Sequence, residues 1–199
     1  MESKSTAETI GRSIDMNKNT VKRALAKQGH NSVLDKIKGS SEKIIETYGE
    51  AVQVARMNVN SSRNIGVYHP LVYSCAILFS NGEVLTSVQS TCVEYGCTVD
   101  PFCKVIKQLE IEKGRNNKPI AIVRVDQYGV CHALPAKDRS YLTEYDMGDI
   151  VCFMHFSSSR LTSHSTRVFS ETSVPSVELY AQTVKSLLPE QCQIDFANQ

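Results

Sequence analysis

Residues 120–125 place the strongest constraint on the fold of this 199-residue chain. They read Ile-Ala-Ile-Val-Arg-Val, an apolar run that is typical of a strand buried on both of its faces. Such a strand needs a covering layer on each side of its sheet. The sequence therefore predicts helices on both faces of a central sheet.

The segments around this run alternate between helix and strand patterns. A hairpin is predicted at Asn81-Gly82, because both residues tolerate positive φ and the turn separates two apolar runs. Asp100 and Pro101 are typical of a helix start, with Asp as the N-cap and Pro in the first helical position. This order favours an α/β fold with a mixed sheet. The expected strands are 71–79, 84–88, 120–125 and 150–156, and the expected helices are 40–57, 101–113, 135–145 and 176–188.

The composition is that of a soluble globular protein, with 41% hydrophobic and 22% charged residues. No stretch approaches the roughly 18 apolar residues of a membrane span, and the first residues lack the apolar core of a secretory signal. Seven cysteines, an odd number spread through the predicted strands and helices, suit reduced thiols better than a disulfide framework. We therefore expect no membrane partner and a cytoplasmic or nuclear location.

Two segments carry a resemblance to a known family. Residues 73–88 contain Ser-Cys-Ala-Ile-Leu before the Asn-Gly turn, where the family has Gly-Ala-Ala-Leu in its first hairpin. Residues 180–189 end in Leu-Leu-Pro, as the closing helix of the family does. On these motifs, residues 40–190 resemble a cytidine deaminase. The resemblance implies a three-layer α/β/α domain, which we place over residues 39–199. The polar and basic residues 1–38 in front of it are expected to form a short helical extension. It also implies a homo-oligomer, or a hetero-oligomer with a deaminase-like paralogue.

The zinc chemistry of that family depends on groups that this chain mostly lacks. A deaminase of this kind needs three protein ligands on zinc and a glutamate that shuttles protons. Cys97 stands at the first ligand position, but Val99 stands where the glutamate belongs. A shift of one residue brings Asp100 to the glutamate position, and the ligand then becomes Thr98.

The second ligand motif is also incomplete. Pro135 matches the family, whereas Ala136 and Arg139 replace the two ligand cysteines. Alanine cannot bind a metal, and a permanently charged guanidinium repels one. We therefore expect a deaminase-like protein with no catalytic residue and no metal cofactor. An active enzyme with a rearranged zinc site is the alternative, and its ligands would come from Cys97, Cys103, Cys131 and His132.

Arg139 and the residues after the second strand give two further hypotheses. The family reads the ribose with Asn and Glu in a region where this chain has Gln89 and Thr91, so these two are the candidate nucleoside-binding residues; Gln89 can still hydrogen-bond, while Thr91 cannot supply a carboxylate. If Arg139 lies where the metal would be, it needs a partner, because an unpaired buried charge is costly. Asp100 is the predicted partner. The alternative is that Arg139 and Asp138 both face solvent.

The basic front of the chain offers a different kind of function. Residues 1–43 carry nine Lys and Arg against five Asp and Glu. Residues 6–27 resemble a helix-turn-helix, packed through Ile10, Ile14, Val21 and Leu25 and capped at the second helix by Asn17. Its second helix would present Lys18, Asn19, Thr20 and Lys22 to a DNA major groove. The alternative is a solvated basic helix or a loosely ordered arm.

Three function classes therefore stand at this point. The first is an inactive deaminase-like protein with a structural, regulatory or nucleoside-binding role. The second is a DNA-binding regulator that acts through residues 6–27. The third is the zinc enzyme with a rearranged site.

Overall fold

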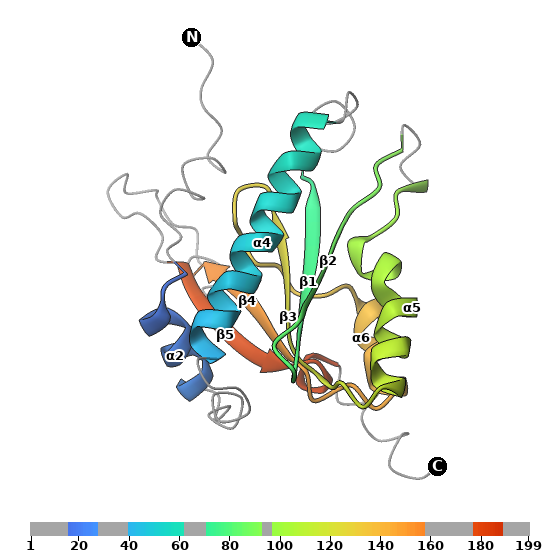
Figure 1. Ribbon diagram of the computed structural model, residues 1–199. Helices are drawn as coiled ribbons and strands as arrows, with labels where there is room; N and C mark the ends of the chain where they lie inside the picture. Colours follow the sequence, from blue (N-terminus) through green and yellow to red (C-terminus); the bar gives the residue numbers. More distant parts are fainter. Residues whose placement is uncertain (1–15, 28–39, 62–70, 93–96, 158–176, 189–199) are drawn as a thin grey trace, which may run out of the picture.

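The computed structural model describes residues 16–27, 40–61, 71–92, 97–157 and 177–188 (Figure 1). Together they form one layered α/β unit. In chain order the elements are α2 (Lys18–Lys27), α4 (Ser40–Ser61), β1 (Tyr73–Phe79), β2 (Val84–Val88), α5 (Pro101–Gly114), β3 (Pro119–Asp126), α6 (Ala136–Glu144), β4 (Val151–Ser157), β5 (Val177–Thr183) and the 3₁₀ helix η3 (Lys185–Leu187).

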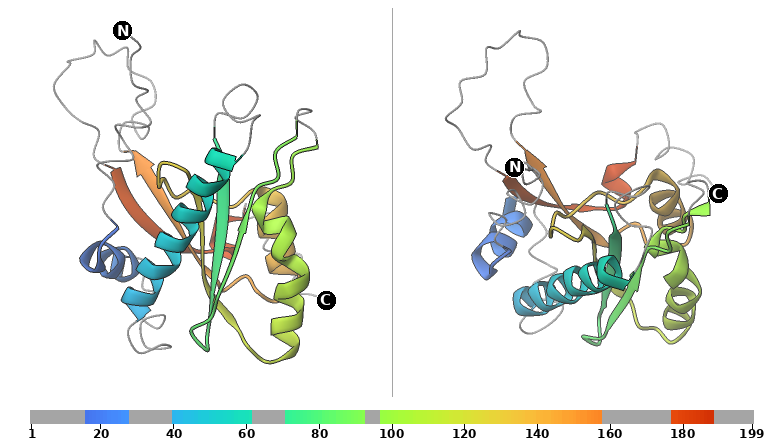
Figure 2. Two further views of the ribbon diagram at one scale, coloured as in Figure 1. Left: turned by 45° about the horizontal axis from the view of Figure 1, so that its top comes forward. Right: turned by 90° about the horizontal axis from the view of Figure 1, so that it is seen from above.

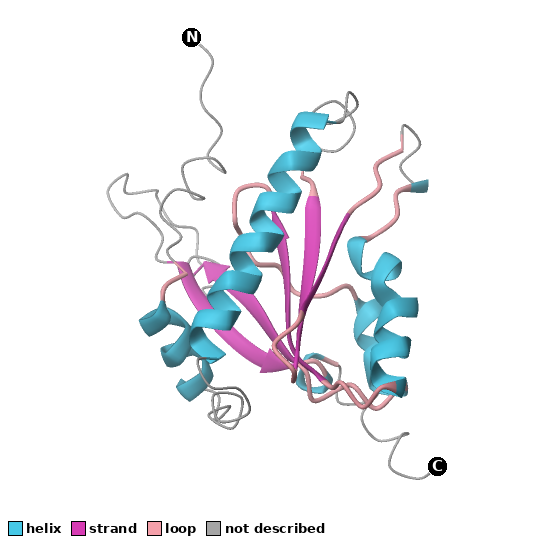
Figure 3. Ribbon diagram, viewed as in Figure 1, coloured by secondary structure: helices cyan, strands magenta, loops and turns pink. Residues whose placement is uncertain are grey.

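The strands form one mixed sheet in the order β2-β1-β3-β4-β5 (Figure 3). β3 and β4 are parallel, and every other neighbouring pair is antiparallel. β3 occupies the centre, as the apolar run 120–125 predicts. In the register of β1 with β3, Tyr73 lies opposite Asp126 and Phe79 opposite Pro119. The end of the sheet that holds Tyr73 and Asp126 is therefore opposite to the end that holds the β1–β2 turn.

Helices cover both faces of the sheet, which gives three layers (Figure 2). Alternate residues of β4 show the division, since Phe153 packs in the core on the α4 side and Cys152 in the core on the α5 side. β1 divides in the same way at Leu78 and Ile77. The predicted three-layer α/β class with a mixed sheet is confirmed.

Local signals placed the hairpin and the start of α5 correctly. Gly82 adopts a φ of +87° in the turn, and its N–H donates to the carbonyl of Phe79 at 3.0 Å. Asp100 caps α5 by accepting a hydrogen bond from the N–H of Phe102 at 3.0 Å. Both features follow from residue types that are favoured in such positions.

The predicted closing helix is wrong. Residues 177–183 form β5, paired antiparallel with β4, and only residues 185–187 are helical. Leu179, Ala181 and Val184 are buried while the residues between them are more exposed, which is close to the two-residue period of a strand. β4 supplies the hydrogen-bonding partner that decides between the two structures, and that partner is distant in the sequence.

α2 packs on the body of the protein. Its Val21, Ala24 and Leu25 are buried in the same core as Ile44 of α4 and Leu179 of β5. None of the helices over the described ranges is long and apolar enough to cross a membrane.

Candidate functional site

The starts of α5 and α6 meet at the carboxyl end of β3, where α/β folds commonly place ligand sites. Asp100 precedes α5, Arg124 lies near the end of β3, and Asp138 lies in the first turn of α6. We call these three residues the α5–α6 junction. They come from three separate elements, so the junction exists only in the folded chain.

Arg124 and Asp100 connect the central strand to the start of α5. The Nη2 and Nε of Arg124 donate to Oδ2 of Asp100 at 3.1 Å and 3.3 Å. The Arg124 side chain is only 11% exposed and that of Asp100 only 22%, so the pair is largely screened from water. A charge-assisted pair with two N–H donors is among the stronger polar contacts in a protein.

An aromatic and a histidine extend the junction along the end of the sheet. The guanidinium of Arg124 lies 3.7 Å from the centre of the Tyr73 ring, a close cation–π contact. Tyr73 packs edge-on against His132, with ring centres 5.1 Å apart. Nε2 of His132 lies 2.8 Å from Oδ2 of Asp126. The position of Arg124 is thus fixed from one side by Asp100 and from another by Tyr73.

Asp138 is a buried carboxyl group in the first turn of α6, with only 2% of its surface exposed. Its Oδ2 has no hydrogen-bond partner among the described residues. Burial, followed by the neighbouring charge of Asp100, raises the pKa of Asp138 to about 7, although Arg124 opposes the shift. Near neutral pH this carboxyl group is therefore present in both protonation states.

The predicted pair of Asp100 with Arg139 is wrong, because Asp100 pairs with Arg124. Arg139 donates from Nη1 to the carbonyl of Leu187, and its Nε is buried without a partner within the described part of the chain. The alternative, in which Arg139 and Asp138 both face solvent, is wrong as well, since Asp138 is buried and Arg139 half-buried. Arg139 instead ties α6 to the segment after β5.

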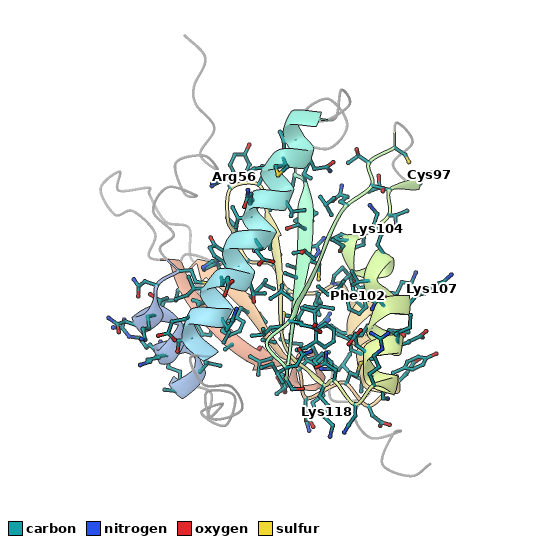
Figure 4. The ribbon with its side chains drawn as sticks, viewed as in Figure 1. Arg56, Cys97, Phe102, Lys104, Lys107 and Lys118 are labelled. Atoms are coloured by element: carbon teal, nitrogen blue, oxygen red, sulfur yellow. The ribbon has the colours of Figure 1, made fainter. Side chains whose placement is uncertain are left out.

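The residues at the positions of the family's zinc ligands do not form a metal site. Cys97 is exposed in the segment before α5, at the outer end of that segment in Figure 4, and Ala136 is also exposed. Val99 is 41% exposed, and its N–H and carbonyl both pair with Ser90. No three His, Cys, Asp or Glu side chains in the described ranges are grouped as a metal ion requires. These donors do not fit zinc.

The rearranged zinc set is not brought together either. Cys131 is buried in the core on the α4 side of the sheet, whereas Cys103 lies on α5, on the opposite side. Burial raises the pKa of both thiols, which disfavours the thiolate that a metal binds. His132 is directed to Asp126.

Gln89 is engaged within the fold. It is 5% exposed, and its Oε1 accepts a hydrogen bond from the N–H of Tyr73 at 3.2 Å. Its backbone N–H donates to the carbonyl of Tyr73 at 2.9 Å, and its own carbonyl accepts from Asn58 at 3.2 Å. Thr91 is half-buried in the segment that follows. The role of Gln89 and Thr91 in binding a nucleoside stays a prediction. The amide oxygen of Gln89 already accepts a hydrogen bond from Tyr73.

The residues predicted to contact DNA lie on the first turns of α2. As predicted, Asn17 caps this helix, since its Oδ1 accepts from the N–H groups of Asn19 and Thr20, each at 3.0 Å. Lys18 forms an ion pair with Glu42 of α4, and Lys22 is exposed. Ile10 and Ile14, on the predicted first helix, lie outside the described residues. DNA binding through residues 6–27 stays a prediction.

Sequence reasoning missed Arg124, which proves to be the cation of the junction. A signal was present, because Arg124 is the charged residue within the apolar run 120–125. A charge in a strand that is buried on both faces needs a partner. The sequence does not say which of the acidic residues supplies it.

Two hollows of about 570 Å³ and about 620 Å³ lie at the opposite end of the sheet from the junction. The first is lined by polar residues of the β1–β2 turn and the end of α5, among them Asn81, Glu112 and Asn117. Asn117 donates to Glu112 at 3.0 Å, and its Oδ1 accepts from Ser80 at 3.3 Å. These contacts fasten the turn to α5, and we assign this hollow a structural role.

The sheet order and the helices that cover both faces place the fold in the mixed α/β class. No family model matches the chain, and no curated protein matches it.

Solved structures do match, among them several cytidine deaminases. The enzyme from Mycobacterium tuberculosis is 20% identical, with a TM-score of 0.47 over 73% of this chain and 93% of that chain. The enzyme from Mycobacterium leprae is 19% identical, with a TM-score of 0.48 over 73% and 96%. The enzyme from Bacillus anthracis is 10% identical, with a TM-score of 0.45 over 76% and 93%. Likeness at this level carries no argument about chemistry, which rests on the residues of the junction.

Proposed function

We propose that this chain is a deaminase-like domain without zinc-dependent deamination, and that its role is structural or regulatory. One observation carries the proposal. Where the family resemblance implies a metal between the starts of two helices, the guanidinium of Arg124 is bonded to Asp100 at the start of α5, and Asp138 is buried at the start of α6. A side-chain cation thus joins the central strand β3 to the start of α5.

The chemistry of the replaced positions supports this role. Zinc generates a nucleophile by lowering the pKa of a bound water from about 15.7 to roughly 7. The set Cys97, Ala136 and Arg139 offers a single ligand, so no such water forms. Val99 has no proton to shuttle, and loss of that step removes a further factor of roughly 10²–10⁴ in rate.

The engagement of Gln89 favours a structural role over nucleoside binding. The residue is 5% exposed, and its Oε1 already accepts a hydrogen bond from the N–H of Tyr73, so little of the amide is open to a ribose hydroxyl. We therefore expect cytidine at millimolar concentration to leave the thermal unfolding midpoint unchanged. An upward shift that grows with cytidine concentration would favour the nucleoside-binding alternative.

The decisive experiment combines elemental analysis with a turnover assay. The full chain, purified from zinc-supplemented medium, is expected to hold far less than one zinc per chain and to leave cytidine and deoxycytidine unchanged. An active cytidine deaminase serves as the assay control. Exposed thiols bind zinc weakly, so Cys97→Ser is the matched variant. About one zinc per chain that is lost in Cys97→Ser, or measurable cytidine turnover, would overturn the proposal.

Assembly is the remaining part of the proposed role. We propose a homo-oligomer, or a hetero-oligomer with a deaminase-like paralogue, on the basis of the family resemblance of the sequence. Light scattering coupled to size-exclusion chromatography distinguishes a monomer of 22.1 kDa from either assembly.

A further inference from the structure

Two cysteines lie on the connection between β2 and α5, next to a residue pair that fixes how the two ends of this connection run. Ser90 and Val99 are antiparallel and exchange both of their backbone hydrogen bonds, at 3.1 Å and 3.0 Å. Cys92 follows Ser90 by two residues, and Cys97 precedes Val99 by two residues. Figures 1 and 2 show the two segments side by side from this pair outward. The cysteines therefore occupy equivalent positions on adjacent segments.

One further step of this pairing brings the two thiols within bonding range. In an antiparallel ladder, side chains two residues apart lie on the same face, so Cys92 and Cys97 are the next opposed pair of the same type as Ser90 and Val99. Opposed residues of that type have Cα atoms about 5.5 Å apart, and a disulfide spans roughly 4.4–6.8 Å. The four residues between the cysteines are a length that hairpin connections commonly have.

Both cysteines are thiols in this structure, and an oxidant has access to them. Cys97 is exposed and Cys92 is half-buried. Burial raises the pKa of the other four described thiols, which disfavours the thiolate that reacts with an oxidant. These four are Cys75, Cys103, Cys131 and Cys152. Cys97 is therefore the thiol best placed to react first.

We propose that Cys92 and Cys97 form a reversible disulfide when the protein meets a peroxide. The thiolate of Cys97 attacks one oxygen of hydrogen peroxide, which leaves a sulfenic acid on Cys97 and releases hydroxide. The thiol of Cys92 then attacks that sulfur, so that the S–S bond forms, the S–O bond breaks and the oxygen leaves as water. In total, two thiols and one peroxide give one disulfide and two waters. A dithiol reductant reverses the reaction by thiol–disulfide exchange.

The disulfide acts on the segment that leads into α5. Asp100 caps this helix, and Lys104 near its start donates to the carbonyl of Val88 at the end of β2, at 2.6 Å. These contacts fix the inner end of the β2–α5 connection, and a bond between Cys92 and Cys97 closes its outer end. The inference concerns only these two thiols, so its outcome is independent of whether the chain turns over cytidine.

Peptide mapping tests the bond in the full chain. The reduced protein is treated with about one equivalent of hydrogen peroxide in the presence of a metal chelator, its remaining thiols are alkylated, and it is digested after glutamate. Cleavage at Glu94 separates Cys92 from Cys97, so a bond between them holds two peptides together until a reductant is added. We expect this linked pair, together with a decrease of about 2 Da in the mass of the chain from the two hydrogens lost.

The pairing of Ser90 with Val99 also predicts that the fold accelerates the reaction. We expect the bond to form at least about tenfold faster in the native chain than in the chain unfolded in urea, because the pairing holds the two segments together. Equal rates in the two states would refute the proposal, since the bond would then owe nothing to the structure.

Two variants separate this bond from general oxidation. Cys92→Ser is expected to stop at the sulfenic acid on Cys97, which dimedone traps. Cys103→Ser is the matched control and is expected to form the linked pair at the wild-type rate. A bond from Cys97 to Cys103, or a sulfinic acid on Cys97 of the wild type without the linked pair, would also refute the proposal.

Discussion

Replacing Arg124 by Met tests the junction most directly. Met retains an unbranched apolar side chain and removes the charge, so the two N–H contacts to Asp100 and the cation–π contact with Tyr73 are lost together. What remains is a largely buried pair of carboxyl groups without a cation. Truncation of one partner of a buried ion pair is costly chiefly because it leaves the other partner uncompensated.

The structure sets the size of the effect. Loss of a fully buried partner costs about 3–5 kcal/mol, and the partial exposure of Asp100 reduces that figure. The contact with Tyr73 adds about 0.5–2 kcal/mol. We expect Arg124→Met to lower the free energy of unfolding by about 2–4 kcal/mol. In a chain of this size, that corresponds to a decrease of roughly 5–15 °C in the unfolding midpoint.

Equilibrium unfolding in urea at pH 7 measures this difference. Lys185→Met is the matched control, because it removes a cation from the pair Lys185–Asp149, whose side chains are 59% and 80% exposed. An exposed pair contributes only about 0–1 kcal/mol. Arg124→Lys keeps the charge but loses the planar, two-donor geometry, so an intermediate loss is expected. The reasoning fails if Arg124→Met stays within about 1 kcal/mol of the wild type or matches Lys185→Met.

Two further predictions concern the core on the α4 side. His155 accepts a hydrogen bond at Nδ1 from the N–H of Cys131 at 2.8 Å, and burial, followed by His132, lowers the pKa of His155 to about 4. Because the folded state disfavours the proton, this contribution to stability is complete above pH 6.5 and is lost as pH falls from about 6.5 to about 4, by at most roughly 3 kcal/mol. Urea unfolding of the wild type and His155→Gln over a series of pH values gives the difference in their free energies of unfolding, and this difference should show the dependence. Taking the difference also removes the opposite pH dependence due to Asp138, which both proteins share. A difference that stays constant with pH would contradict the prediction. Leu25→Ala should cost about 2–5 kcal/mol in the same assay, because the Leu25 side chain is fully buried, whereas Lys22→Ala on the exposed face of α2 should change stability by less than about 0.5 kcal/mol. Equal effects of the two variants would show that α2 does not contribute to the core.

Features that depend on residues close together in the sequence were predicted correctly, whereas features that depend on distant residues were not. Asp100, Pro101 and the Asn81-Gly82 turn act within a few residues of themselves, and all were placed correctly. The segment 177–183 was assigned to a helix, because its strand structure depends on pairing with β4. A short apolar pattern cannot separate a strand from a helix when the deciding partner is remote.

The junction shows the same limit at the level of the site. Arg124 and Asp100 are 24 residues apart, and the sheet register and the path of the chain into α6 bring them together with Asp138. The sequence indicated that the zinc ligands were missing and that a charge near the starts of α5 and α6 would need a partner. It named Arg139 instead of Arg124, because residue types alone do not show which side chain reaches Asp100.

The docking of α2 has a practical consequence for dissecting this protein. β5 is an edge strand, and α2 covers the apolar side chains near it while Lys27 pairs with Glu178 of that strand. A fragment that starts at residue 39 would expose the apolar side chains of the α4-side core that α2 covers, and a large exposed apolar patch promotes aggregation. Loss of DNA binding after such a deletion would then report precipitation as readily as a missing contact. Charge reversal at the exposed Lys22 leaves the buried face of α2 intact, so a loss of DNA binding in that variant would report a lost contact and not aggregation.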